Sequence, residues 1–356
     1  MSLRERALVV AVAGVLVWLF FDALVIAFGE SPRELIALLL RGTWGTPYGV
    51  GQVLYKATPL LFSGLSVSFA LRAGIFNIGA ESQMAVGALV AALVGAHVGG
   101  LSPLLAVPCV LVAAALAGGA WAAPAAALRA RYGVHEVIST ILLNRVADAG
   151  ITFALAAGLA QKATVRTADV AASARLPRLD RWFPALHGSA VSVSLAVAFS
   201  VLALVVLSFN RSRFGRELFL VANGPDAASA ERIPVARRRF QALVVAGGIA
   251  GLAASATVLG FKGGYEAGLG AGAGFTGIAV ALLGRESFFG LACAALLFGT
   301  LQQGGLVLNA RVPMELMDVL QAIVILVVGA ADPAVRRWFR EARRPAEAPA
   351  STGGAA

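Results

Sequence analysis

Long apolar runs dominate this chain and decide the solvent in which it folds. They occupy residues 7–28, 104–128, 191–207, 288–301 and 319–331. A helix of about 20 apolar residues matches the hydrocarbon thickness of a bilayer. Hydrophobic residues make up 59% of the chain and charged residues 13%, whereas a soluble domain carries roughly a quarter charged residues. The sequence therefore predicts an all-α, polytopic helical membrane protein and excludes a soluble enzyme, a disordered chain and a disulfide scaffold.

The apolar content suffices for about ten transmembrane segments. We expect a transmembrane domain over 1–331 that contains a long cytoplasmic loop at 209–239, followed by a disordered cytoplasmic tail at 332–356. One segment is too short to cross unaided, which predicts re-entrant or broken helices. The expected spans are 7–28, 54–71, 79–98, 103–128, 136–158, 190–208, 240–260, 275–285, 288–308 and 314–331.

The distribution of positive charge predicts the orientation of these spans. The formal net charge of +10 is interpreted as Arg and Lys at the cytoplasmic ends of spans and against anionic membrane lipid, with no nucleic acid as a partner. An even number of spans places both termini on one side. The segments on the side of the N-terminus hold more Arg and Lys than those opposite, despite a charged outer loop at 159–189. Both the N-terminus and the C-terminus are expected to be cytoplasmic.

Patterns typical of enzymes and metal sites do not occur in the sequence. The chain contains no GxxxxGK[ST] phosphate-binding loop and no catalytic dyad or triad. Its three His and two Cys form no cluster with metal-ligand spacing. Cys109 and Cys293 lie within apolar runs, so we expect buried thiols and no disulfide. No enzymatic activity, metal or bound cofactor is predicted for this chain.

The densest polar segment in the apolar part is GIFNIGAESQM, residues 74–84. Its glycines allow the backbone to break, and Asn77 is placed to cap the resumed helix. Irregular backbone at membrane depth is tolerated where it is buried in protein or faces water. Asn77, Glu81 and Gln83 are therefore candidates for the wall of a substrate pathway. The alternative is an ordinary capped helix start at the cytoplasmic interface.

A glycine-rich segment, GGYEAGLGAGAGFTGI, covers residues 263–278. It contains a GxGxxG pattern at 272–277, but no βαβ unit surrounds it, so a dinucleotide site is not predicted. The segment predicts an irregular re-entrant stretch that leads into a short helix. Tyr265, Phe275 and Thr276 join the pathway candidates.

Polar residues also recur in HEVISTILLNRVAD, residues 135–148. Glu136, Ser139 and Asn144 are further pathway candidates, since polar groups within a span mark functional positions. Arg145 and Asp148 are three residues apart, which lets them pair on one helix face. We interpret these two as an internal structural ion pair that lowers the cost of both charges.

The cytoplasmic loop contains a candidate short helix. Pro225 suits the first helical turn, Asp226 suits its positive end, and Pro234 bars continuation. An exposed helix between two spans can dock into the groove of a partner. The alternative is a solvated connector.

Three segments together resemble a known family. They are FNIGAESQ at 76–83, GVHEVISTILLN at 133–144 and GFTGIAVALLG at 274–284. They are similar to segments of the permease subunits of bacterial nucleoside-type ABC importers, within the superfamily of branched-chain amino acid and simple-sugar ABC permeases. The resemblance covers most of the chain and implies a bacterial plasma (inner) membrane protein that transports a purine or pyrimidine nucleoside.

The resemblance also implies a division of labour among partners. ABC ATPase subunits bind ATP and Mg and drive transport, and a periplasmic or lipid-anchored substrate-binding protein delivers the substrate. A second, homologous permease subunit completes the pathway, and a heterodimer is expected. The stretch 222–234 is similar to the family's coupling helix, although Ala222, Gly224, Glu231 and Arg232 depart from its pattern. The implied ATPase-coupling residues are Asn223, Gly224, Pro225, Asp226, Ala227, Ala228, Glu231 and Arg232.

Three other functions stay open at this point. A simple-sugar (ribose-type) ABC permease would share the same architecture. A proton-coupled secondary transporter would use Glu81 or Glu136 and would run without ATP. A membrane scaffold without transport is disfavoured by the polar residues within spans.

Overall fold

The computed structural model describes residues 3–284, 287–313 and 315–327 of this chain. Among these residues the regular secondary structure is helical, apart from three isolated antiparallel β-bridges that all involve residues of the loop at 160–192. Six of the described helices are long and apolar enough to cross a membrane, or seven if a bent pair counts as one span. The fold is thus all-α and polytopic as predicted, but the count of about ten spans is not confirmed. The predicted tail at 332–356 lies outside the described residues.

The helices follow one another with short connections, except at 160–192, where three 3₁₀ turns form an ordered loop. A further helix occupies 315–327. The other elements are α1 (Leu3–Ala27), α2 (Pro32–Thr43), α3 (Pro47–Leu71), α4 (Ala80–His97), α5 (Pro103–Tyr132), α6 (Glu136–Ala154), η1 (Leu155–Leu159), η2 (Ala172–Ala174), η3 (Leu179–Arg181), η4 (Pro184–Leu186), α7 (Ser194–Arg211), α8 (Arg213–Asn223), α9 (Pro225–Ala230), α10 (Val235–Gly251), η5 (Ser255–Lys262), α11 (Ala273–Gly284) and α12 (Phe288–Leu308).

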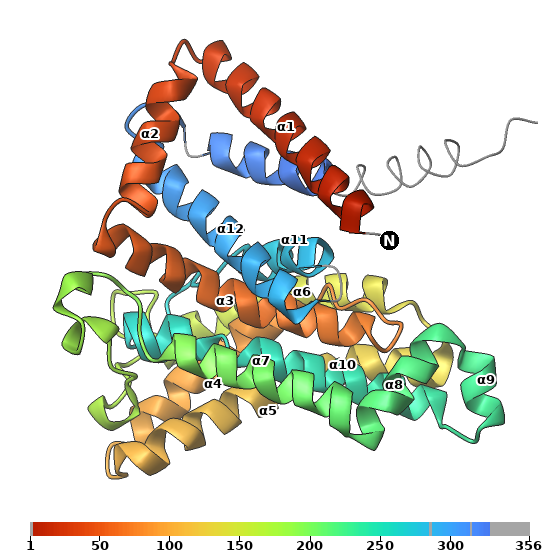
Figure 1. Cartoon of the computed structure of the whole chain (residues 1–356). Helices are drawn as coiled ribbons and strands as arrows, with labels where there is room; N and C mark the ends of the chain where they lie inside the picture. Colours follow the sequence, from red (N-terminus) through yellow and green to blue (C-terminus); the bar gives the residue numbers. More distant parts are fainter. Residues whose placement is uncertain (1–2, 285–286, 314, 328–356) are drawn as a thin grey trace, which may run out of the picture.

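Helices α3 and α10 form the centre of the bundle (Figure 1). Within its most apolar window α3 is 83% buried inside the chain, against 28% for α5 and 22% for α7. The outer helices present apolar side chains to the surroundings, as helices in lipid do. Cys109 and Cys293 are free and exposed on these outer faces, so the expectation of buried thiols is wrong.

Glycines bring α10 into close contact with α5. A Cβ at Gly247 of α10 would lie 2.5 Å from the carbonyl oxygen of Gly118 in α5. One turn further, a Cβ at Gly251 would overlap the carbonyl oxygen of Ala114. Small residues at a helix interface let the backbones approach, which van der Waals packing rewards in a membrane.

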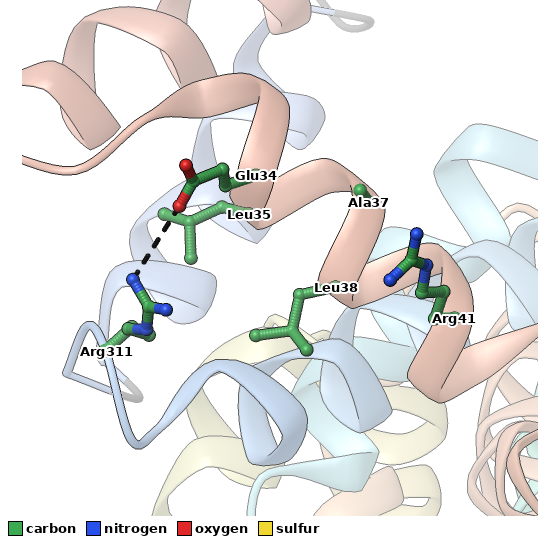
Figure 2. A pocket seen from close by; sticks show the side chains of 6 residues that line it. All are labelled: Glu34, Leu35, Ala37, Leu38, Arg41 and Arg311. Atoms are coloured by element: carbon green, nitrogen blue, oxygen red, sulfur yellow. Dashed lines mark ion pairs between the residues drawn. The ribbon is translucent and has the colours of Figure 1, made fainter.

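Helix α2 was not predicted from the apolar runs. It is amphipathic and turns by 110° from α1, so a search for uninterrupted apolar stretches does not find it. Arg311, in the turn after α12, forms ion pairs with Glu30 at 3.3 Å and with Glu34 of α2 at 3.8 Å. Figure 2 shows Arg311 and Glu34 at a pocket that Leu38 of α2 also lines.

Different elements lie at the two ends of the bundle. Helices α8 and α9 occupy one end, at the right of Figure 1, and the loop at 160–192 lies towards the other. The turn after α3 reaches the α8 end, where a Cβ at Gly74 would lie 3.2 Å from the Cα of Ala222. Helix α11 has 12 residues and begins at Ala273, two residues before the predicted segment 275–285. Its length of about 18 Å is too short to cross the bilayer.

Candidate functional site

The helical backbone is interrupted between α3 and α4, at residues 72–79, and this non-helical segment is here called the break. Two side-chain amides stabilise it. Asn77 is completely buried and donates to Gln83 Oε1 at 2.8 Å and to Ser66 Oγ of α3 at 3.0 Å. Gln83 donates back to Asn77 Oδ1 at 2.9 Å. The two amides therefore satisfy each other, as buried polar groups must.

The N-terminus of α4 differs from its predicted form. The helix begins at Ala80 with Gly79 as the N-cap, so the prediction that Asn77 caps it is wrong. The oxygen of Asn77 accepts from the Gly79 N–H at 3.1 Å. An Asn side chain that bonds the backbone two residues on stabilises a turn, and here it sets the entry to α4.

Helix α6 supports the same break through Asn144. Its oxygen accepts from the Ser82 N–H at 3.2 Å, and its amide donates to the Ile78 carbonyl at 3.1 Å. The Ser139 hydroxyl donates instead to the Glu136 carbonyl within α6, at 3.1 Å. Asn144 thus positions α4, whereas Ser139 bonds its own helix.

Glu136 anchors the start of α6 to the other side of the break. Its buried carboxylate accepts from the Phe76 N–H at 3.1 Å and forms an ion pair with Arg129 of α5 at 3.4 Å. Sequence reasoning placed Arg129 among the charges that set topology and missed this contact. An ion pair that also accepts a backbone hydrogen bond is a stable way to hold a buried carboxylate.

Glu81 connects the break to the re-entrant segment. Its two carboxylate oxygens accept backbone N–H bonds from Gly272 at 2.6 Å, Gly274 at 2.7 Å and Phe275 at 3.3 Å. These donors lie at the start of α11, where the helix leaves N–H groups unpaired and carries partial positive charge. A carboxylate from α4 therefore caps a helix that lies about 190 residues further along the chain.

The other candidates of the glycine-rich segment occupy different environments. Tyr265 is buried, and its backbone pairs with Thr167 of the loop at 160–192 at 2.9 and 3.0 Å. Phe275 is 50% exposed at the start of α11. The Thr276 hydroxyl donates to the Gly272 carbonyl at 2.9 Å. Of these three residues, Phe275 is the one whose side chain is exposed.

The Arg145 and Asp148 side chains approach each other to 4.0 Å on α6, as their spacing predicts. Their side chains are 85% and 63% exposed. The two residues therefore pair as predicted, but the pair lies on the surface of this chain and not inside its bundle. The buried face of α6 carries Asn144, Ala147 and Ile151. Since Arg145 and Asp148 lie off this face, helix periodicity turns them away from the chain's own bundle.

The predicted coupling segment forms a separate six-residue helix, α9, which begins at Pro225 as expected. Ala228 is its buried contact, while Pro225, Asp226 and Ala227 are exposed. Asn223 is the last residue of α8, and its side-chain amide donates to the Phe219 carbonyl at 2.8 Å. The remaining members lie at its ends: Gly224 precedes α9, and Glu231 and Arg232 follow it.

Glu217 fixes α8 and was missed by sequence reasoning. The buried carboxylate accepts from Arg213 one turn earlier at 2.7 Å and from Arg238 of α10. Burial alone would raise its pKa, but the hydrogen bonds from Arg213 and Arg238 outweigh this and hold the pKa of Glu217 below its usual value. This clamp, formed by Arg213, Glu217 and Arg238, ties α8 to the central helix α10.

A bundle of apolar helices with a broken span, tied to a half-length helix at its N-terminus, is an arrangement found in membrane transport proteins. The comparisons with known proteins agree with this class. Residues 49–329 match the family described as branched-chain amino acid transport system / permease component, and the chain belongs to this family.

Individual relatives cover nearly the whole chain. The guanosine ABC transporter permease protein NupP of Bacillus subtilis is 34% identical over 92% of this chain and 94% of its own length. A glucose ABC transporter permease protein of Haloferax volcanii is 32% identical over 85% of this chain and 81% of its own. The nucleoside ABC transporter permease protein NupB of Lactococcus lactis is 29% identical over 91% of both chains. The predicted resemblance is confirmed.

Proposed function

We propose that this chain is a permease subunit of an ATP-driven ABC importer for nucleosides in a bacterial inner membrane. The observation that carries the proposal is the near full-length similarity to permease proteins named for guanosine and nucleoside transport. The motif FNIGAESQ, which forms the break before α4 and contains Asn77 and Glu81, is fully ordered and bonded in this chain. The proposed substrate, a nucleoside, is a neutral solute with several hydrogen-bonding groups.

The proposed complex contains two different permeases. Two permease proteins of Lactococcus lactis, NupB and NupC, are similar to this chain at 29% and 25% identity, which supports a heterodimer. Separate ABC ATPase subunits bind ATP and Mg, and a periplasmic or lipid-anchored binding protein delivers the nucleoside. The lack of a phosphate-binding loop in this sequence is consistent with that division.

We further propose ten membrane segments with both termini in the cytoplasm. The six long apolar helices supply six of them, and α1, α4, α11 and the helix at 315–327 supply the other four. Helices α8 and α9 then lie at the cytoplasmic end, where the ATPases bind. The loop at 160–192 faces the binding protein.

Transport proceeds by alternating access. ATP brings the ATPases together, α9 moves with them, and the Glu217 clamp passes the motion to α10. The candidates Asn77, Gln83, Glu136 and Asn144 hold the break that works as the gate, and Ser139 stabilises the first turn of α6 beside it. Glu81, Tyr265, Phe275 and Thr276 connect the gate to the re-entrant segment.

Reconstitution tests this function. The chain, its permease partner and the ATPase in vesicles with the binding protein should accumulate labelled nucleoside only with ATP inside. Uptake that persists with an ATPase unable to hydrolyse ATP would overturn the proposal and favour the proton-coupled alternative. Accumulation of ribose or glucose but not of nucleosides would favour the sugar permease, to which the Haloferax volcanii relative is similar.

Deletion of residues 223–232 tests the coupling role. The variant should keep ATPase activity in the complex and lose nucleoside uptake, because α9 links the two. Replacing these residues with a Gly/Ser segment of equal length controls for the shortened connection. Unchanged uptake per ATP in both variants would contradict the role of α9.

A further inference from the structure

The polar residues at the break are buried and already bonded to one another and to the backbone. Asn77, Gln83 and Asn144 are 0%, 1% and 5% exposed. Their amides bond to one another and to the backbone of the break. A solute could bind them only by breaking the contacts that hold α4 in place, so its path must lie elsewhere.

The outward face of α6 has the polar capacity that the break lacks. Arg145 and Asp148 lie near the middle of the candidate span Glu136–Leu159, with 85% and 63% of their side chains exposed. A charge at the centre of a spanning helix costs about 2.5–3.5 kcal/mol when it meets lipid. Two neighbouring charges therefore mark a face that meets water or another protein chain.

This face continues onto the start of α11. Asn144, which precedes Arg145 in α6, accepts a hydrogen bond from the Ser82 N–H at 3.2 Å, and Ser82 directly follows Glu81. Glu81 in turn holds the exposed backbone of Gly272. Phe275 is half exposed in the next turn of the chain, so an aromatic surface lies near the charged groups.

We propose that Arg145, Asp148, Glu81 and Phe275, here called the α6–α11 strip, line the water-filled translocation passage, whose opposite wall is supplied by the second permease subunit. This inference rests on the proposed function and adds the face of the chain that the substrate contacts. The guanidinium of Arg145 donates hydrogen bonds, the Asp148 carboxylate accepts them, and the Phe275 ring offers a stacking surface. A neutral solute with a flat aromatic base and hydroxyl groups fits this combination.

Thiol accessibility tests the strip in the assembled complex in membrane vesicles. Cys109 and Cys293 are first replaced by alanine, because both are exposed. Ala149→Cys then places a thiol beside Asp148 and one turn from Arg145, and Ala203→Cys places one at mid-height of α7. Both alanines are exposed on spanning helices, which makes the two variants a matched pair. A membrane-impermeant, water-soluble maleimide reacts with the thiolate, which forms only in water.

The strip predicts at least tenfold faster labelling of Ala149→Cys than of Ala203→Cys. Saturating guanosine should slow labelling at residue 149 and leave residue 203 unchanged. Equal rates at the two positions, or no labelling at residue 149, would overturn the inference, because the face would then meet lipid or a dry interface.

Uptake by the same complexes separates this inference from the proposed function. Nucleoside uptake without labelling at residue 149 would leave the function standing and refute the strip. Fast labelling without any nucleoside uptake or protection would refute the proposed substrate while the strip stays water-lined. Phe275→Leu should raise the KM for nucleosides severalfold with little change in stability, and an unchanged KM would remove the aromatic ring from the passage.

Discussion

The carboxylate of Glu81 lies 2.7 Å from the backbone nitrogen of Gly274, which follows it by 193 residues. This hydrogen bond joins the first turn of α4 to the first turn of α11, and each of these helices follows a stretch of irregular backbone. The negative charge meets the positive end of a helix dipole. The start of α4 and the glycine-rich segment at 263–278 are therefore held together by the Glu81 carboxylate.

Glu81→Gln should weaken that unit. The amide keeps the size of the side chain but turns one acceptor into a donor that opposes the N–H groups of α11. Since a hydrogen bond to a charged group contributes about 1.5–3 kcal/mol, we expect the free energy of unfolding to fall by about 2 kcal/mol and uptake to drop strongly. Unfolding in mixed micelles, followed by circular dichroism, measures the first effect. An unchanged transition would mean that α11 holds its place without the carboxylate.

Gly274→Ala should be among the least tolerated glycine substitutions. An added Cβ would overlap the backbone nitrogen and Cα of Glu81, and a backbone cannot move aside as a side chain can. We expect the same loss of stability as for removal of the Glu81 contact. Gly14→Ala in α1 is the control, because a Cβ there meets nothing within 4 Å and alanine is the better helix former. Equal stability of both variants would contradict the tight contact.

The Glu217 clamp predicts a stability difference that depends on pH. The pKa of Glu217 is held below its usual value by Arg213 and Arg238 in spite of burial. A depressed carboxylate pKa gives stability that is complete above the unfolded value of about 4.3 and is lost as the pH falls through the folded pKa. At pH 7 the thermal midpoint of the wild type should therefore exceed that of Glu217→Gln.

The control for this clamp is the pH series itself. The difference between wild type and Glu217→Gln should shrink below about pH 4 as the carboxylate protonates. Arg238→Gln, which removes the partner on α10, should lower the midpoint at pH 7 more than Arg213→Gln, because Arg213 is 86% exposed. A difference that stays constant down to pH 3 would show that the charge of Glu217 is not what stabilises α8.

Ala227→Trp should block coupling without harming the fold. Ala227 is exposed on α9, beside the buried Ala228, so a bulky side chain there clashes only with a bound partner. We expect nucleoside uptake per ATP hydrolysed by the assembled complex to fall at least tenfold. Ala185→Trp on the exposed turn η4, towards the other end of the bundle (Figure 1), is the matched control and should couple normally. Normal coupling by Ala227→Trp would place the coupling contact outside α9.

Much of the polar framework could be predicted from local patterns. The residues of the break, the glycine-rich segment and the α9 helix were found because polar, Gly and Pro residues interrupt apolar runs. Helix α2 was not found, because the charged residues Arg33, Glu34 and Arg41 leave only a short apolar run in it. The direction of Arg145 was not found either, since spacing predicts that two residues share a helix face but not which way that face points.

The apolar runs by themselves determined that this chain folds in a bilayer as a bundle of helices. An apolar run long enough to span the bilayer forms a helix there, because a helix pairs all its backbone N–H and C=O groups within the segment. The motifs then identified the family. Only the tertiary structure decided which polar groups are used up internally and which are available to a solute. Glu81 finds its partners almost 200 residues away, and Asn77 is closed off by Gln83. Arg145 and Asp148 are left facing outward because packing, not sequence spacing, selects the buried side of α6.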